Sequence, residues 1–134
     1  MLSKTGRYIG GIDPKTEHTK IMEILENGDC VVRYDLRLKT GKLDFSYDDR
    51  KVAFHVSSKV GVDIQRVTRL RRYPSKKLNL NAMTFDLMTG RFEKVTECKG
   101  EFDCYYPGFT RDGNLVYLQQ APNYNYEFIF LRHQ

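Results

Sequence analysis

Histidines and carboxylates, the residue types best suited to proton transfer or metal binding, are spread thinly along this chain. The three histidines lie far apart, at His18, His55 and His133. No HExxH, GxSxG or phosphate-binding Walker motif occurs. The aspartates at 48, 49 and 112 lack the DxDxDG spacing of a calcium loop. The sequence therefore gives little support to catalysis and none to a metal or cofactor, and we expect His55 to be a satisfied or edge histidine of a strand.

Cysteine chemistry is similarly restricted. Cys30, Cys98 and Cys104 cannot all pair within one chain. No CxxC or CxxCH occurs, so zinc, thioredoxin-like and attached-haem sites lack their spacing. We expect buried or idle thiols, with a bridge between Cys98 and Cys104 across adjacent strands as the alternative. The redox state of all three cysteines stays open.

Basic charge is concentrated in one segment. The six basic residues of this segment are Arg66, Arg69, Arg71, Arg72, Lys76 and Lys77. Net charge is +5, yet outside this segment 16 basic residues face 17 acidic ones. A nucleic-acid footprint usually spreads over a face of the domain. We therefore expect a solvated loop, with an anionic partner, nucleic acid or an acidic protein surface, as the functional alternative.

Aromatic residues form a second candidate contact region. The stretches CYYPGF at 104–109 and NYNYEFIF at 123–130 are rich in tyrosine and phenylalanine. Tyr105 and Tyr106 are candidate ligand or partner contacts, and packing between sheets is the structural alternative.

The elements that must position these residues are short strands. A chain of 134 residues with 40% apolar content fits one domain with a packed core. Strands are expected at 42–46, 51–56, 80–87, 91–96, 102–110, 114–120 and 126–132. Residues 17–28 have weak helical periodicity, but the Asn27-Gly28 turn signal favours a strand, a turn and a strand continuing through 30–38. Residues 57–77 interrupt this rhythm as a basic insertion loop.

One sequence motif, called a phrase below, occurs twice in the chain. Residues 43–54 read LDFSYDDRKVAF and residues 107–118 read PGFTRDGNLVYL. Placing Phe45 on Phe109 aligns Ser46 with Thr110, Asp48 with Asp112, Val52 with Val116 and Phe54 with Leu118, at an offset of 64 residues. Asp48 and Asp112 are expected to accept hydrogen bonds from turn amides, and Gly113 permits a positive φ.

At these residues the chain resembles the TolB-like family of β-propellers. Blades of that family begin with a pattern close to P-x-[WF]-[ST]-x-D-G-x-x-[IVL]-[AVY]-[FYL], where x is any residue. Residues 107–118 follow this pattern well, whereas 43–54 lack the leading Pro and the Gly. The segment FDLMTGRFEKVT resembles the way such blades end. The resemblance covers about 80 residues and implies an all-β fold of two to three four-stranded antiparallel sheets.

The expected blades do not close a ring. Residues 42–96 would form one whole blade, 102–132 three strands of another, and 7–40 the remains of a preceding one. Closed propellers typically have four to eight blades. We therefore expect self-association, a protein partner or a longer polypeptide to cover the outer flanks. The N-terminal GRYIGGI is expected to add an outer strand to the final blade.

Two function classes follow from the resemblance. The first is a non-catalytic binding or scaffold module for a protein or small ligand. The second is an accessory propeller portion of a peptidase or periplasmic oxidoreductase. The resemblance alone suggests a periplasmic location, and residues 1–15 lack the apolar stretch of a secretory signal. No apolar run approaches the length of a membrane span.

Overall fold

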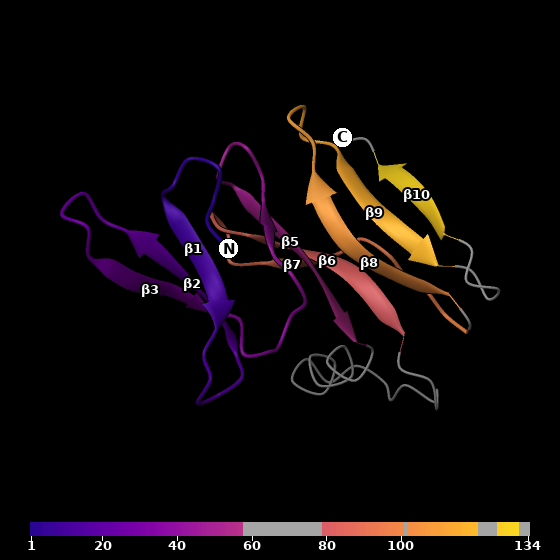
Figure 1. Cartoon of the computed structure of the whole chain (residues 1–134), viewed down its shortest axis with the longest axis horizontal. Coiled ribbons are helices and arrows are strands. Elements are labelled where there is room, and N and C mark those ends of the chain that lie inside the picture. Colours follow the sequence, from indigo (N-terminus) through magenta and orange to yellow (C-terminus); the bar gives the residue numbers. More distant parts are fainter. Residues whose placement is uncertain (58–78, 101, 121–125, 132–134) are drawn as a thin grey trace.

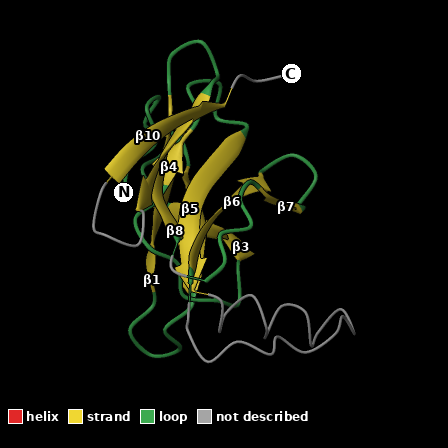
Figure 2. Cartoon of the chain, turned by 90° about the vertical axis from the view of Figure 1, so that its right-hand side faces the viewer, coloured by secondary structure: helices red, strands yellow, loops and turns green. Residues whose placement is uncertain are grey.

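Three small antiparallel sheets make up the described part of the chain. A computed structural model describes residues 1–57, 79–100, 102–120 and 126–131. Within these ranges every regular element is a β-strand, and the sheets follow one another across the molecule in chain order (Figure 1). The view from the side shows only strands and loops among the described residues (Figure 2). Those residues contain no helix with the length and apolar character of a membrane span. The all-β expectation is confirmed.

The first sheet is built from the N-terminal third of the chain. Its strands are β1 (Tyr8–Ile12), β2 (Thr19–Ile24) and β3 (Cys30–Asp35), in that order. Between β2 and β3 the amide of Leu25 donates to the carbonyl of Asp29 at 2.8 Å, and Gly28 has φ +88°. The Asn-Gly hairpin is confirmed and the helical alternative for 17–28 is wrong, because alternating apolar residues fit a pleated sheet.

The second sheet is the complete one. It contains β4 (Asp44–Phe45), β5 (Lys51–Ser57), β6 (Leu80–Asp86) and β7 (Phe92–Lys94), paired in sequence order. The expectation that 42–96 forms one four-stranded blade is confirmed. The expected insertion 57–77 lies outside the described residues apart from Ser57, which ends β5 and pairs with Leu80.

The third sheet contains β8 (Asp103–Phe109), β9 (Leu115–Gln120) and β10 (Tyr126–Leu131), with β9 in the centre. This confirms three strands in 102–132. The N-terminal GRYIGGI does not add to this sheet. Residues 8–12 pair with β2 of the first sheet, so the expected strand addition within the chain is wrong. Residues 8–12 continue directly from a tight turn, which leaves local pairing as the shorter route.

All three sheets open with the same hydrogen-bonded turn. The amide of Ser46 donates a hydrogen bond to the carbonyl of Lys51 at 2.8 Å, and the Lys51 amide donates one to Ser46 Oγ at 2.9 Å. Ser3 and Tyr8 repeat both bonds, at 2.8 and 2.9 Å. The same kind of turn lies at 110–114, where the Thr110 amide donates to the Asn114 carbonyl at 2.8 Å. The first sheet is therefore a blade whose short first strand is residues 1–3, joined to β1 by the bridge between Leu2 and Ile9.

The spacing of these turns identifies the repeat length. Ser3 and Ser46 are 43 positions apart, and Ser46 and Thr110 are 64 apart. A propeller blade of the WD40 type takes about 40–45 residues. Most of the surplus lies between the second and third strands of the blade: Ile9 and its partner Met22 are 13 positions apart, whereas the equivalent Val52 and Phe85 are 33 apart. The first blade therefore spans 43 residues, and the longer connection between β5 and β6 accounts for most of the extra length of the second.

The expected alignment of the two phrases is off by one residue after the turn. Phe45 pairs with Val52, whereas Phe109 pairs with Leu115 and not with Val116. The turn at 110–114 is one residue shorter than the turn at 46–51, so every later side chain changes face relative to the expected alignment. The structurally equivalent residues are Val52 with Leu115 and Phe54 with Tyr117, all four of which are buried.

Adjacent sheets pack through unlike flanks. We call the face of a sheet that points to the preceding sheet its leading flank, and the opposite face its trailing flank. The leading flank of the second sheet carries large side chains such as Phe45, which stacks on Tyr8 of the first sheet, and Phe85, which meets Tyr34 edge to face. Its trailing flank carries small ones, including the fully buried Ala53 and Ala82. The first interface thus packs rings against rings, whereas the second leaves room beside small side chains for those of the third sheet.

Candidate functional site

A bulge in β8 presents two tyrosines on the first strand of the third blade. The pairing of β8 with β9 shifts register between Tyr105 and Gly108. Tyr106, inside the bulge, has φ +52°, an uncommon conformation for a bulky residue. Its side chain is 60% exposed, although Tyr105 beside it is half-buried. The bulge therefore turns an aromatic ring outward, a use of bulges that recurs near binding sites.

His55 of β5 joins these two rings into an aromatic cluster. The ring centroids of His55 and Tyr106 are 5.3 Å apart, and those of Tyr105 and Tyr106 are 4.7 Å apart, both with edge-to-face geometry. His55 and Tyr105 lie at 6.2 Å in the same arrangement. We call His55, Tyr105 and Tyr106 the aromatic cluster. It bridges the trailing flank of the second blade and the first strand of the third.

The protonation state of His55 follows from its contacts. The backbone amide of Tyr106 donates to His55 Nδ1 at 3.3 Å, so Nδ1 accepts and the proton of the neutral ring is on Nε2. Burial lowers the pKa of His55 below the ordinary value of 6.5. His55 is therefore neutral near pH 7, which agrees with the expectation of a satisfied strand histidine.

Gly41 fixes the position of the His55 ring from the other side. A Cβ at position 41 would overlap the Nε2, Cε1 and Cδ2 atoms of His55. The Gly41 amide also donates to the His55 carbonyl at 2.8 Å. The connection between the first and second blades therefore needs glycine here for the imidazole to lie against Tyr105 and Tyr106.

The aromatic cluster offers ring faces and edges for non-covalent contacts. Exposed aromatic rings attract planar, apolar and cationic groups. No group of three or more histidine, cysteine or acidic residues suited to a metal occurs in the described ranges. The arrangement fits recognition of a partner group on Tyr106, with His55 and Tyr105 supporting that ring.

The predicted turn residues lie at one end of the blades. Asp48 Oδ1 accepts from Ser46 Oγ at 2.6 Å and from the Arg50 amide at 3.0 Å. The Ser46 hydroxyl, the Arg50 amide and Arg50 charge lower the pKa of Asp48 below its usual value, although burial opposes them. Asp112 is exposed at the equivalent turn, where Gly113 has φ +85°. Asp49 takes the place of Gly113 in the second blade, with φ +57°.

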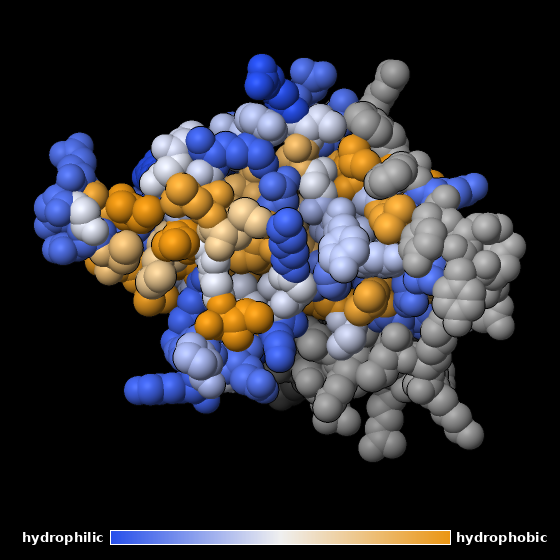
Figure 3. All heavy atoms as spheres, viewed as in Figure 1, coloured by the Kyte–Doolittle hydropathy of each residue, from blue (hydrophilic) through white to orange (hydrophobic). Residues whose placement is uncertain are grey.

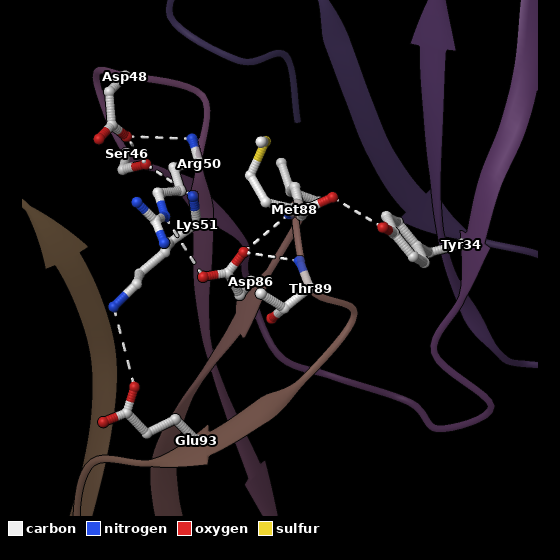
Figure 4. A network of polar contacts seen from close by, with 10 residues as sticks. Tyr34, Ser46, Asp48, Arg50, Lys51, Asp86, Met88, Thr89 and Glu93 are labelled. Atoms are coloured by element: carbon white, nitrogen blue, oxygen red, sulfur yellow. Dashed lines mark hydrogen bonds and ion pairs between the residues drawn. The ribbon is translucent and has the colours of Figure 1, made fainter.

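A groove of about 650 Å³ separates the opening turns of the second and third blades. Its lining includes Tyr47, Asp48, Arg50, Lys51, Asp86, Phe109, Arg111 and Asp112. Asp86 accepts from the amides of Met88 and Thr89 at 2.8 and 3.1 Å and lies 3.5 Å from Arg50 Nε (Figure 4). Burial disfavours its charge, but these contacts lower its pKa overall. Within the groove Arg50 and Asp86 form an ion pair, and Lys51 pairs with Glu93 of β7 outside the lining.

Contacts from three blades meet at Asp44. Its Oδ1 accepts from Lys4 Nζ at 2.9 Å, and its Oδ2 accepts from the Phe109 amide at 2.7 Å. Thr5 Oγ1 of the first turn donates to Asp49 of the second. Cations of the first and third turns, Lys4 and Arg111, lie over the Tyr47 ring at 4.5 and 5.9 Å. The opening turns are therefore joined to one another across all three blades.

The structure joins two of the cysteines. Cys98 and Cys104 form a disulfide with a Cα separation of 6.0 Å, and Cys104 is buried. The preference for idle thiols at these two positions is wrong, because the connection after β7 brings Cys98 beside β8. Cys30 is free and exposed at the start of β3.

The six basic candidates, Arg66, Arg69, Arg71, Arg72, Lys76 and Lys77, lie outside the described residues. The structure places only the ends of their segment, at Ser57 and Asn79. Tyr105 and Tyr106 are the candidates that the structure brings together. Sequence reasoning missed His55 as their partner, Asp44 as the junction of the blades, and the opening turn at 3–8. The Ser-x-x-Gly spacing of Ser3 and Gly6 is the signal that could have revealed that turn.

Solved structures with a similar chain path are propeller proteins. TolB from Agrobacterium tumefaciens superposes with a TM-score of 0.56 at 14% identity, over 91% of this chain and 38% of that one. Oligogalacturonate lyase from Vibrio parahaemolyticus gives 0.57 at 13% identity, over 91% of this chain and 33% of that one. The tricorn protease gives 0.57 at 16% identity, over 88% of this chain and 10% of that one. The chain has the fold of three consecutive propeller blades.

These likenesses establish the fold alone. This chain spans less than two fifths of the length of each of those proteins. No family model matches the chain, and no curated protein is similar to it. The neighbours are TolB-like propeller proteins, which agrees with the resemblance carried by residues 107–118. Propellers host many unrelated functions, so activity has to be argued from the site.

Proposed function

We propose that this chain is a TolB-like propeller section that works as a non-catalytic binding module, with the aromatic cluster as its contact site. The observation that carries the proposal is the outward-turned ring of Tyr106 on the bulge of β8. An exposed tyrosine in an uncommon backbone conformation costs free energy, of order 1–3 kcal/mol, which the surrounding structure must offset. Such features cluster at ligand and partner sites.

The position of the aromatic cluster supports this proposal. First strands of propeller blades surround the central channel, and β8 is the first strand of its sheet. His55 and Tyr105 hold the Tyr106 ring from one side, which limits its motion before binding. A rigid aromatic ring loses little conformational entropy when a partner docks on it. The expected partner is a protein or small ligand that offers a planar, apolar or cationic group.

A matched pair of tyrosine variants tests the proposal. Crosslinked complexes are isolated from the source cells with the wild-type chain, Tyr106→Ala and Tyr47→Ala, and their components are identified by mass spectrometry. Tyr47 is also exposed, but it lies at the opening turns. The proposal expects a partner that is retained by wild type and Tyr47→Ala and is depleted at least about tenfold with Tyr106→Ala. Equal recovery with all three chains contradicts it.

Anion binding through the basic segment is a second proposal with its own observation. The segment contains six basic residues, and its ends are held together where Ser57 pairs with Leu80. Its test is the salt dependence of binding to a labelled single-stranded DNA oligonucleotide, for wild type and for the Arg69→Ala, Arg71→Ala, Arg72→Ala triple variant. Fewer phosphate contacts should give a shallower salt slope. An unchanged slope removes the proposal.

A further inference from the structure

The leading flank of the first blade carries an apolar row with no covering sheet among the described residues. Bridge and strand pairing place Leu2, Ile9, Met22 and Val32 side by side across four strands. Leu2 and Val32 are each 55% exposed. Hydrophobic residues gather over the first sheet in the space-filling view (Figure 3). We call these four residues the leading row.

The residues equivalent to the leading row in the next blade are buried in a blade-to-blade interface. At the 43-residue repeat, Leu2 corresponds to Phe45 and Ile9 to Val52. Phe45 is 1% exposed and Val52 is 0% exposed, because the first blade covers them. The first blade thus carries, with no described sheet over them, the two positions that form the centre of a blade-to-blade interface.

The opposite kind of flank is uncovered at the other end. Val116 and Leu118 of β9 alternate with the buried Leu115 and Tyr117, so they lie on the trailing flank of the third blade. Both are half-buried. In the second blade the position equivalent to Val116 is Ala53, which the third blade covers completely. Among the described residues, no further sheet therefore covers the leading flank of the first blade or the trailing flank of the third.

The sizes of the residues on these two flanks match each other. Within the chain, Leu43 and the tip of the Phe45 ring lie over Gly10, where an added Cβ would overlap Leu43 Cδ1 and lie 3.5 Å from Phe45 Cζ. The tip of the Phe45 ring thus lies over a position without a side chain, while its face stacks on Tyr8. At the outer flanks the equivalent residues are Leu2 and Val116. The leading residue is smaller than Phe and the trailing one is larger than Gly, so the pair fills a similar volume.

We propose that a second copy of this chain covers these flanks, with the leading row of each copy packed on Val116 and Leu118 of the other. Both interfaces inside the chain join a leading to a trailing flank, and this contact repeats that geometry. Two such contacts are identical by symmetry and close on themselves. Two copies of three blades give six blades, within the four to eight that closed propellers use.

Site-directed disulfide formation tests the pairing of the flanks. In a Cys30→Ser background, one tagged copy carries Leu2→Cys and a differently tagged copy carries Val116→Cys. The proposal expects mixed-tag crosslinks under mild oxidation and no crosslinks between two Leu2→Cys copies. Tyr47→Cys in place of Val116→Cys is the matched control, because Tyr47 is exposed at the opening turns away from both flanks. Crosslinking equal to that control overturns the pairing.

The mass in solution tests the assembly independently. Light scattering should give twice the 15.7 kDa chain mass. Leu2→Asp and Leu118→Asp should each raise the dissociation constant by roughly 30-fold or more, because each places a charge in an apolar contact. Met88→Asp, at an exposed apolar residue of the turn after β6, should leave it unchanged. Far-UV circular dichroism checks that each variant keeps its strands.

Each remaining outcome counts against the proposal. A wild-type monomer at concentrations well above micromolar overturns it, as does a dimer that Leu2→Asp and Leu118→Asp leave intact. An open series of copies with the expected crosslinks overturns the closed two-copy ring, because a heterologous contact that fails to close extends into a filament.

Discussion

The Asp44 carboxylate accepts a hydrogen bond from the backbone amide of Phe109 at 2.7 Å. This bond connects the first strand of the second blade to the end of the first strand of the third. The same carboxylate holds Lys4 of the first blade through its other oxygen. The carboxylate of Asp44 therefore connects three consecutive blades at the end where their opening turns meet. Neighbouring blades of this chain are joined by specific polar contacts as well as by their apolar flanks.

Removing this carboxylate should loosen the three turns together. Asp44→Ala leaves the Phe109 amide without its acceptor, and we expect a loss of about 1–2 kcal/mol of unfolding free energy. Asp44→Asn keeps an acceptor for Phe109 and should lose less, since the exposed ion pair with Lys4 contributes little. Urea denaturation measures both. Equal stability of Asp44→Ala and wild type would show that the contact is unimportant.

The glycine of the third opening turn is required by backbone conformation alone. Gly113 has φ +85°, and a Cβ there would meet nothing within 4 Å. Gly113→Ala should therefore cost about 1–2 kcal/mol through the left-handed backbone and not through a clash. Gly108→Ala is the matched control, because Gly108 lacks a positive φ and its Cβ would make an ordinary contact. Thermal denaturation that gives the same midpoint for both variants would refute this explanation.

The bridge between Cys98 and Cys104 should stabilise the join between the second and third blades. It closes a short loop, for which the chain-entropy relation gives about 2 kcal/mol. The double variant Cys98→Ser, Cys104→Ala should lose that amount, whereas Cys30→Ser should lose nothing because Cys30 is exposed and free. Intact-mass measurement before and after reduction checks the bond directly. Three alkylated thiols in the unreduced chain would contradict it.

His55 should make stability depend on pH below neutrality. Burial lowers the pKa of His55 in the folded chain, so the unfolded chain binds more protons between that pKa and 6.5. Stability should accordingly rise with pH through this window and level off above about pH 6.5. His55→Gln should flatten the step, and His18→Gln should keep it. Denaturation midpoints between pH 5 and 8 measure the difference, and a step that survives in His55→Gln rules His55 out.

The strands and the opening turns were predictable because their signals are local. The turn at 46–51 follows from the hydrogen-bonding carboxylate of Asp48 and the turn at 110–114 from Gly113, and the alternation of β5 and β9 follows from the pleat. The turn at 3–8 escaped prediction because Thr5 stands where the other two turns have Asp48 and Asp112. The one-residue shift before Leu115 was hidden because both possible registers place apolar residues at the paired positions.

The candidate site was only half visible for a different reason. The adjacent tyrosines at 105 and 106 are plain in the sequence, but the bulge that turns Tyr106 outward is a property of pairing with β9. His55 meets them from a strand 50 positions away, and its place depends on the absence of a side chain at Gly41. Long-range packing of this kind has no local signature.

The central claim is that three blades open with one repeated turn, the third turn being one residue shorter. Nuclear Overhauser contacts between facing backbone protons test it most directly. We expect contacts of Leu2 with Ile9, Phe45 with Val52, and Phe109 with Leu115. Contacts of Phe109 with Val116 in place of Leu115, or their absence between Leu2 and Ile9, would contradict the repeat as the structure has it.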